Sequence, residues 1–188
     1  HGYVSGGTTT STNIIDKFTF VSDADATFVG QLSNAPYGLS GQSSVTYGYA
    51  SGGELSGSVY ITTIDKFSFT SDANATNVGD LTVARNYTSG HSSNTHGYTS
   101  AGTTASRQNV IDKFSFATEG MSTNVGDTTV ARISTSGTSS TTHGYTSGGN
   151  VSSPVLDVID KFSFTSDGDA TDVGNLFVSR SYTSGTQY

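Results

Sequence analysis

Apolar and polar side chains alternate most regularly in residues 64–69, which read IDKFSF. Phe67 and Phe69 fall on one side of this stretch, and Ile64 and Lys66 fall on the other. Alternation with a period of two residues is typical of a β-strand that packs differently on its two faces. No segment of the chain shows the 3.6-residue apolar period of a helix, so the pattern predicts an all-β protein with essentially no helix.

The same stretch returns three more times, and each copy is followed by Val-Gly and then by Ser-Gly. The distance from the Ile of IDKF to the Ser of Ser-Gly is 25 residues in every copy. Successive copies lie 49, 47 and 48 residues apart, which indicates a tandem repeat architecture. The four IDKF motifs occupy residues 15–18, 64–67, 111–114 and 159–162.

Four short strands are expected in each repeat. Around the second motif, residues 64–69 and 76–81 alternate as strands do, and residues 71–75 between them form a turn rich in Asp and Asn. Two further strands are expected at residues 86–94 and 96–101. Residues 86–94 are mostly small and polar, which suits a strand in a crowded position.

Length varies in only one part of the repeat. The segment between the Gly-Gly pair and the Ile of IDKF holds 7, 10, 8 and 9 residues in the four copies. Insertions are tolerated on exposed loops and not inside paired strands. We therefore expect the variable segments to be surface loops between the second and third strands, at residues 8–14, 54–63, 103–110 and 150–158.

Composition narrows the possible partners. The 188 residues are only 32% hydrophobic and 12% charged, but aromatic residues reach 11% and recur at fixed repeat positions, as core residues do. The net charge of −7 would repel a phosphate backbone, so nucleic acid is not an expected partner. The chain has no Cys and no apolar run near the roughly 20 residues that span a bilayer. It begins at His1 without a Met, which we interpret as a processed or trimmed piece.

Four strands in about 47 residues suggest the blade of a β-propeller. The succession of GYTSGG, a variable loop, an aromatic strand and a link ending in Arg resembles the kelch repeat. Kelch blades carry a Gly-Gly at the end of the second strand. The fourth-strand Trp that is usual in kelch blades is replaced here by Val29, Val78, Val125 and Val173.

Two other resemblances concern the turns and the overall style of the repeats. The turns at residues 70–76 and 165–171 resemble a degenerate Asp-box of sialidase-type propellers, although they lack its Gly and its final aromatic residue. The short, nearly identical Gly/Ser/Thr-rich repeats also resemble kelch-like repeat proteins of bacteriophages, including phages of marine cyanobacteria. That resemblance implies a virion-borne protein.

We interpret residues 1–188 as one propeller domain with repeats at about 1–46, 47–95, 96–142 and 143–188. The chain opens at HGYVSGG, a second-strand motif, and closes at SYTSGTQY, a first-strand motif. We therefore expect residues 181–188 to pair beside residues 1–7 and to close a ring of four four-stranded blades. The alternative is an open arc whose tail pairs with another copy or with a longer chain.

Two Phe of each motif are expected to be among the most buried side chains, packed between neighbouring sheets. Truncation of one such residue, as in Phe114→Ala, is expected to cost about 3–5 kcal/mol of stability. The eight residues are Phe18, Phe20, Phe67, Phe69, Phe114, Phe116, Phe162 and Phe164.

Three Arg end the links between repeats, namely Arg85, Arg132 and Arg180, and Pro36 takes that place in the first copy. On one interpretation they form a partial ring that binds a carboxylate or a sulfated glycan. The interpretation that we favour is structural: each Arg ties its repeat to the next, through the Asp of the fourth strand or the Asp of IDKF.

The other polar residues at fixed repeat positions are also interpreted as structural. A half-buried carboxylate needs a partner, so the Asp of IDKF is expected to bind the backbone or a basic group of the adjacent repeat. The Asp/Asn turn pairs offer hard oxygens to Ca²⁺ but lack a full ligand set. Symmetry spaces the recurring His too widely for one metal ion. No metal site and no cofactor are therefore predicted; the residues are Asp16, Asp65, Asp112, Asp160, His1, His96 and His143.

The predicted function is binding or adhesion to a surface glycan or protein, from an extracellular or virion-surface position and without enzymatic activity. The second hypothesis is a structural decoration or assembly protein of a phage particle or fibre, with possible homo-oligomers. A glycosidase is the third hypothesis and the least favoured. A sialidase-like site needs an Arg triad, an acid and a Tyr nucleophile, and three equivalent Arg do not form such a triad.

The variable loops and the links between repeats are expected on the same side of the domain, with the Asp-rich turns opposite. We place the binding site on the loop side, so a ligand bound only on the Asp-rich side would contradict the hypothesis. The candidate ligand-binding residues are Arg85, Arg132, Arg180, Arg107, Tyr60 and Glu54, and no catalytic residue is assigned.

Overall fold

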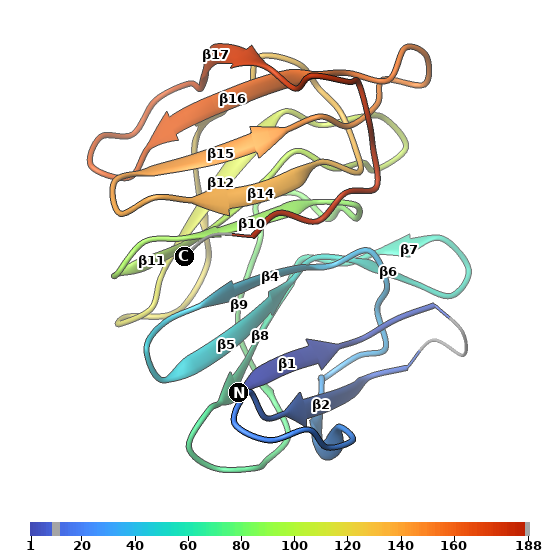
Figure 1. Ribbon diagram of the computed structural model, residues 1–188, viewed down its shortest axis with the longest axis vertical. Helices are drawn as coiled ribbons and strands as arrows, with labels where there is room; N and C mark the ends of the chain where they lie inside the picture. Colours follow the sequence, from blue (N-terminus) through green and yellow to red (C-terminus); the bar gives the residue numbers. More distant parts are fainter. Residues whose placement is uncertain (9–11, 187–188) are drawn as a thin grey trace.

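The computed structural model describes residues 1–8 and 12–186, and all regular structure in these two ranges is β-strand (Figure 1). The strands form antiparallel sheets that follow one another along the chain. The prediction of an all-β fold without helix is confirmed for these residues. Four of the sheets correspond to the four repeats, and their arrangement is consistent with a β-propeller-like fold.

The first sheet has three strands, β1 (Gly2–Ser5), β2 (Ile14–Phe18) and β3 (Thr27–Gln31). The second sheet has the order β4 (Ser40–Ser43), β5 (Tyr47–Ser51), β8 (Thr63–Ser68) and β9 (Thr76–Asp80). The third has the order β10 (Ser89–Ser92), β11 (His96–Ser100), β12 (Val110–Ser115) and β13 (Thr123–Asp127). The fourth has the order β14 (Ser136–Ser139), β15 (His143–Ser147), β16 (Val158–Ser163) and β17 (Thr171–Asn175). A separate hairpin joins β6 (Glu54–Leu55) to β7 (Val59–Tyr60).

The register of each sheet explains why Gly precedes the recurring Tyr. Gly97 of β11 lies opposite Phe114 of β12, and the ring of Phe114 folds across it. A Cβ atom at Gly97 would lie 2.3 Å from this ring, which no real contact allows. The second and fourth sheets repeat the arrangement, so the Gly-Tyr pair and the Phe of IDKF are parts of one packing unit.

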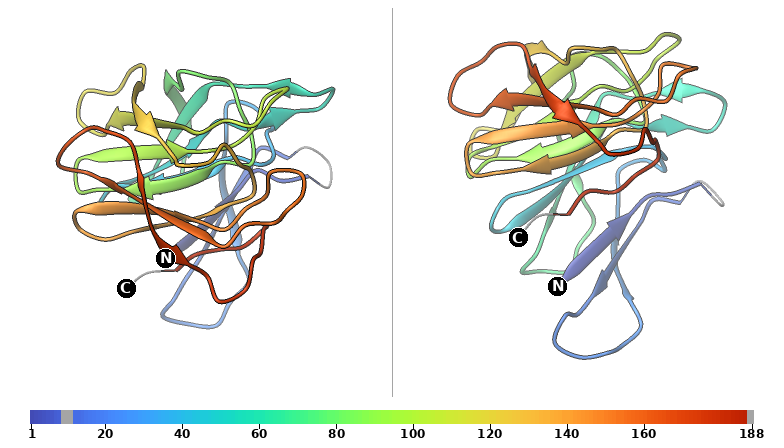
Figure 2. Two further views of the ribbon diagram at one scale, coloured as in Figure 1. Left: turned by 90° about the horizontal axis from the view of Figure 1, so that it is seen from above. Right: turned by 45° about the horizontal axis from the view of Figure 1, so that its top comes forward.

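Consecutive sheets pack face to face (Figure 2), and the apolar core lies between them. Tyr49 of the second sheet stacks on Phe116 of the third, with ring centroids 4.8 Å apart, and also contacts Phe114 at 5.5 Å. Ile64, from the opposite side of IDKF, completes this cluster. Equivalent stacks join the other neighbouring sheets, as Tyr3 with Phe69 and Tyr98 with Phe164.

The prediction that both Phe of each motif are among the most buried side chains is confirmed for the Phe of IDKF in the last three repeats and wrong in the first, and the second Phe of the last three motifs is only partly buried. Phe67, Phe114 and Phe162 are 8%, 4% and 3% exposed. Phe18 is 37% exposed and Phe20 is 73% exposed. Each buried Phe is covered by a Tyr of the preceding sheet, and no sheet in the described part of the chain lies over Phe18 and Phe20.

The links between repeats contact the variable loops, as the sequence predicts. Short antiparallel bridges join the link residue to the first residue of a loop in three repeats. Links and loops therefore lie on the same side of the sheets. The loop of the second repeat also contains the β6–β7 hairpin, which the sequence pattern does not predict. The bridged pairs are Tyr37 with Glu54, Asn86 with Thr103, and Ile133 with Asn150.

The predicted closure of a ring through residues 181–188 is not seen. Residues 181–186 contain no strand and pair with no residue of β1, while residues 187–188 lie outside the described part. The Tyr182 N–H instead donates to the Ser134 carbonyl at 2.9 Å, continuing a series that runs from Gly38 through Tyr87. The first sheet therefore has three strands, and it lies at the opposite end of the molecule from the fourth (Figure 1).

Candidate binding site

Glu54 lies where the second variable loop meets the link before its sheet. Its backbone exchanges two hydrogen bonds with Tyr37, at 3.0 and 2.9 Å. Glu54 is 8% exposed, and its carboxylate accepts a hydrogen bond of 2.5 Å from the Asn86 side chain. Hydrogen bonding to this carboxylate raises the pKa of Tyr37 to about 12. Glu54 is therefore a buried acceptor that holds two links and a loop together.

Four tyrosines form what we call the tyrosine patch: three gather around Glu54, and the fourth, Tyr182, contacts Tyr87. Tyr60 and Tyr87 lie close enough to Tyr37 to contribute to its raised pKa. Burial raises the pKa of Tyr87, and neighbouring Tyr182, Glu54 and Tyr60 raise it further. The rings of Tyr87 and Tyr182 meet edge to face, with centroids 6.2 Å apart. The tyrosine patch consists of Tyr37, Tyr60, Tyr87 and Tyr182.

The tyrosine patch combines flat apolar rings with neutral hydroxyl groups. Tyr182 is 72% exposed, and Tyr37, Tyr60 and Tyr87 are partly exposed. A phenol is protonated at neutral pH, so its hydroxyl both donates and accepts hydrogen bonds. Large, rigid aromatic side chains of this kind supply binding area at a low cost in conformational entropy. The patch suits a neutral ligand that carries hydroxyl groups beside apolar faces.

Two of these tyrosines adopt a backbone conformation that disfavours large side chains. Tyr87 has φ of 51° and Tyr182 has φ of 56°, both in the left-handed region. Gly38 occupies the same repeat position with φ of 65°. Positive φ at a non-Gly residue costs free energy and concentrates at functional sites. Ser134 also occupies this position, with φ of 57°, so the left-handed conformation belongs to the repeat and does not by itself mark the tyrosines as functional.

Arg85 and Arg132 do not reach the surface. Both side chains are 0% exposed, and their guanidinium groups form ion pairs with Asp112 at 2.7 Å and with Asp160 at 3.0 Å. Arg85 also donates to the Ala101 carbonyl at 2.9 Å. The structural interpretation of these two Arg is confirmed, because each ties a link to the IDKF motif of the next sheet. A fully buried side chain offers no surface to a ligand.

The remaining predicted residues lie in different places. Arg180 is exposed at the far end of the fourth sheet. Arg107 donates to the backbone and side-chain oxygens of Asn150, both at 3.1 Å, and so joins two variable loops. Of the six candidates, the structure brings together only Tyr60 and Glu54.

Three of the four tyrosines in the patch are missing from the sequence-based candidates. Tyr37 precedes its Ser-Gly pair by three residues, whereas Tyr87 and Tyr182 precede theirs by two. The recurrence of Tyr two residues before Ser-Gly is a signal that the sequence does contain. Its meaning depends on the convergence of the links, which the repeat pattern alone does not reveal.

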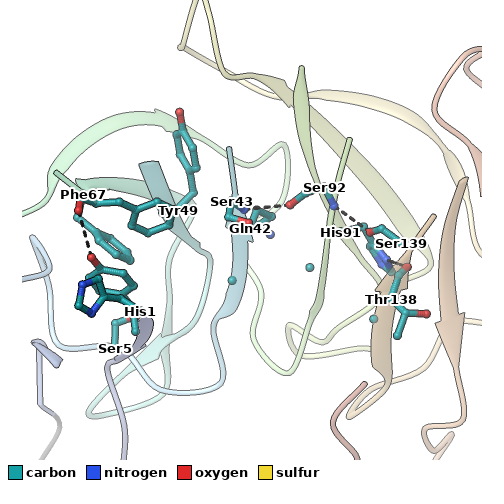
Figure 3. Close-up of a pocket in the computed structure, with 16 residues that line it drawn as sticks. His1, Ser5, Gln42, Ser43, Tyr49, Phe67, His91, Ser92, Thr138 and Ser139 are labelled. Carbon is teal, nitrogen blue, oxygen red and sulfur yellow. Dashed lines mark hydrogen bonds between the residues drawn. The ribbon is translucent and has the colours of Figure 1, made fainter. Parts of the chain in front are cut away.

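A pocket of about 400 Å³ lies between β1 and the first strands of the other sheets, β4, β10 and β14 (Figure 3). His1, Tyr3 and Ser5 face it from β1. In the second, third and fourth sheets, a first strand pairs with the second strand, but no strand pairs with this edge of β1 in the described chain. The pocket therefore borders an unpaired strand edge.

The polar side chains on the opposite wall of the pocket already have partners. Gln42 Nε2 donates to Thr99 Oγ1 at 3.0 Å, and its carbonyl accepts from Ser51 at 3.2 Å. His91 lies 2.8 Å from Ser100 Oγ, and burial lowers its pKa to about 4. Since these groups satisfy one another, the pocket presents few free polar groups to a ligand.

The Asp-rich turns connect neighbouring sheets. Lys17 contacts Asp72 at 2.6 Å, Lys113 contacts Asp167 at 2.7 Å, and Lys66 contacts Glu119. Asn74 and Asp169 each accept a backbone N–H from the preceding sheet, at 3.1 and 3.0 Å. Within residues 1–8 and 12–186, no group of three or more His, Asp or Glu side chains is arranged to hold a metal ion.

No protein-family model matches this chain, and no curated protein matches it significantly. In the part of the chain that the structure describes, no helix is long and apolar enough to cross a membrane.

Proposed function

We propose that this chain is a non-enzymatic binding module that recognises a surface glycan or protein through the tyrosine patch. The observation that carries the proposal is the convergence of Tyr37, Tyr60 and Tyr87 on the buried Glu54 carboxylate, with Tyr182 packed against Tyr87. Tyrosine is enriched at binding hot spots because one side chain combines apolar area with a hydrogen-bonding group. The sheets beneath the patch supply the rigid frame that such contacts need.

We propose in addition that the repeat sheets are blades of a kelch-like β-propeller that works on an extracellular or virion surface. The repeated order of four antiparallel strands and the series of stacked sheets support this proposal. The location of the variable loops beside the tyrosine patch also supports it, because binding surfaces of rigid scaffolds commonly lie on loops.

A glycan array probed with the labelled chain, followed by titration of the best ligand, tests the binding proposal. Tyr60→Ala and Tyr182→Ala are expected to weaken binding about thirtyfold, the equivalent of roughly 2 kcal/mol for a hot-spot residue. Met121→Ala is the matched control, because Met121 is 69% exposed in a turn on the opposite side.

Binding that survives both tyrosine substitutions and is lost in Met121→Ala would contradict the location of the site. A chain that binds no glycan on the array would favour a protein ligand, which pull-down with wild-type and Tyr60→Ala chains would test. Equal capture by the two chains would overturn the tyrosine patch as the recognition surface.

A second candidate function is that of a structural component of a particle or fibre. The observation that favours it is the presence of uncovered apolar residues at both ends of the series of sheets, including Phe20 at one end and Phe177 at the other. Exposed apolar surface of this kind marks interaction sites. Detection of the chain at a regular spacing on a purified particle would support this function.

A further inference from the structure

The first sheet presents one uncovered face, which we call the head face. Phe18 and Phe20 lie on it with their rings 5.6 Å apart at 78°, the edge-to-face geometry of the three buried Phe pairs. Asp16 and Asp23 stand at the positions where Asp112 receives Arg85 and where Asp72 receives Lys17. In the described chain, neither Asp16 nor Asp23 forms an ion pair.

The fourth sheet presents the opposite uncovered face, which we call the tail face. Tyr145 occupies the position of Tyr98 and is only partly buried, whereas Tyr98 is 1% exposed. Lys161 and Arg180 occupy the positions of Lys113 and Arg132. Neither forms an ion pair within residues 1–8 and 12–186, although their counterparts between the sheets do.

A glycine on the tail face indicates that a neighbour fits there. At the corresponding Gly126, a Cβ atom would lie 2.2 Å from the carbonyl oxygen of Gly168 in the next sheet. Gly79 approaches Gly120 in the same way. Gly174 has no atom of the structure within 4 Å of an added Cβ. Gly30 likewise approaches Ala73, so Gly174 keeps open the space that a neighbouring turn fills at the other three positions.

We propose that the tail face of one chain docks onto the head face of a second copy of this chain. The contact would repeat the interface between neighbouring sheets: Tyr145 on Phe20, Arg180 with Asp16, and Lys161 with Asp23. Both faces are halves of an interface that the chain already forms three times internally. The two ends therefore match in aromatic stacking, in charge and in shape.

The backbone is arranged for the same contact. Residues 181–186 already lie in the path of a first strand, because Tyr182 hydrogen-bonds Ser134 as Ser134 hydrogen-bonds Tyr87. The edge of β1 that would pair with them in a second copy is unpaired and borders the 400 Å³ pocket. An unpaired strand edge is a template for pairing with another chain. The proposed contact supplies each free edge with its partner.

One position on the tail face departs from the internal pattern. Thr82 Oγ1 donates to Asp112 at 2.6 Å, and Thr129 Oγ1 donates to Asp160 at 2.6 Å. Phe177 stands at the equivalent position and is 100% exposed. At this position the Thr hydroxyl that binds the Asp of IDKF is therefore replaced by an apolar side chain. The Phe177 backbone N–H remains available to Asp16 of the second copy.

The interface is heterologous, since two different faces of the same chain meet. Such contacts generate a closed ring if the rotation between copies returns to the start, and an open helical filament if it does not. This inference goes beyond the proposed binding function and does not depend on the tyrosine patch. Failure of either proposal leaves the other intact, because one is measured by ligand binding and the other by mass.

Sedimentation velocity over a range of concentrations tests the proposal with the 188-residue chain. The wild type is expected to associate, and Phe20→Asp and Tyr145→Asp are each expected to remain monomeric with unchanged circular dichroism. Val45→Asp is the matched control, because Val45 is 95% exposed in the turn after β4, away from both faces. A wild type that is monomeric at every concentration would overturn the proposal, and so would loss of association in Val45→Asp alone.

Cross-linking separates contact between copies from closure within one chain. The chain contains no Cys, so Phe20→Cys and Tyr145→Cys each introduce a single thiol. Mixing the two variants with a short bismaleimide is expected to give a heterodimer in much higher yield than either variant alone. If the mixture gives none, while a chain carrying both Cys cross-links to itself as a monomer, the ends meet within one chain and the proposal is wrong.

Discussion

At the scale of single residues, buried ion pairs help to hold together sheets whose apolar core is small. Only 32% of the residues are hydrophobic, and Arg85 and Arg132 are among the largest fully buried side chains. The Arg85 guanidinium donates to Asp112 and to three backbone carbonyls, whereas Arg132 donates through Nη2 alone, to Asp160 and to the Thr146 carbonyl. A buried pair of this kind is costly to break, because removal of one partner leaves the other charge uncompensated.

Arg85→Leu is expected to lower the free energy of unfolding by about 3–5 kcal/mol, since it leaves Asp112 buried without its ion pair. Urea denaturation followed by circular dichroism measures the effect. Lys161→Met, measured at a concentration where the chains are monomeric, is the matched control, because it also removes one positive charge but breaks no ion pair in the described chain, and it should change stability by less than about 1 kcal/mol. Equal midpoints for the two variants would show that the Arg85–Asp112 pair does not hold the sheets together.

His91 makes the stability of the protein sensitive to pH. Burial lowers the pKa of His91 from 6.5 to about 4, so the folded chain keeps the imidazole neutral where the unfolded chain binds a proton. A lowered His pKa gives full stability above pH 6.5, which is then lost as the pH falls toward 4. The expected loss from this group is about 3 kcal/mol.

The contribution of His91 can be separated from that of the carboxylates with His91→Gln. Gln42 occupies the same position in β4, so the substituted residue has a precedent in this fold. The free energy of unfolding is expected to depend less steeply on pH between 6.5 and 4 in the variant than in the wild type. Parallel profiles for the two chains would mean that His91 is protonated in the folded state as readily as in the unfolded state.

At the scale of the strand, glycine positions reveal where two sheets meet. Gly126 and Gly174 stand at the same repeat position with φ of 151° and 148°. Any backbone strain caused by Ala is therefore similar at the two positions. Only at Gly126 would the added methyl group collide with the next sheet, at 2.2 Å from the Gly168 carbonyl oxygen.

Gly126→Ala is therefore expected to be less stable than Gly174→Ala by roughly 1–3 kcal/mol, the usual cost of overpacking. Thermal unfolding of both variants at a concentration where the chains are monomeric measures the difference. A Gly174→Ala variant as unstable as Gly126→Ala would show that backbone strain, and not contact between sheets, requires the glycine.

The strands were predictable from the sequence because their pattern is local. The alternation in IDKFSF predicts a strand at residues 64–69, where the structure has β8 (Thr63–Ser68), and the segment after the Asp-rich turn predicts one at residues 76–81, where the structure has β9 (Thr76–Asp80). The β6–β7 hairpin was not predictable, because it lies in a variable loop of one repeat and therefore leaves no repeating pattern in the sequence. The tyrosine patch was missed for a related reason: Tyr37, Tyr60 and Tyr87 belong to different segments that meet only through Glu54.

At the scale of the whole molecule, the repeat predicts the succession of sheets but not how the succession ends. Phe18 has the same local sequence as Phe114, and the two differ in burial only because a sheet covers one and not the other. Coverage of an end depends on the rotation between consecutive sheets. That rotation is set by packing over the entire interface, which no single repeat encodes.

A series of sheets that contact only their neighbours should be least stable at its ends, because an end sheet has one interface and an internal sheet has two. Hydrogen exchange measured by mass spectrometry at low protein concentration is expected to show much faster exchange for β1 and β2 than for β11 and β12. β1 has an unpaired edge and β2 carries the exposed Phe18, whereas β12 carries the buried Phe114. Indistinguishable exchange across these strands would mean that the four sheets open as one cooperative unit and that the uncovered faces carry no local instability.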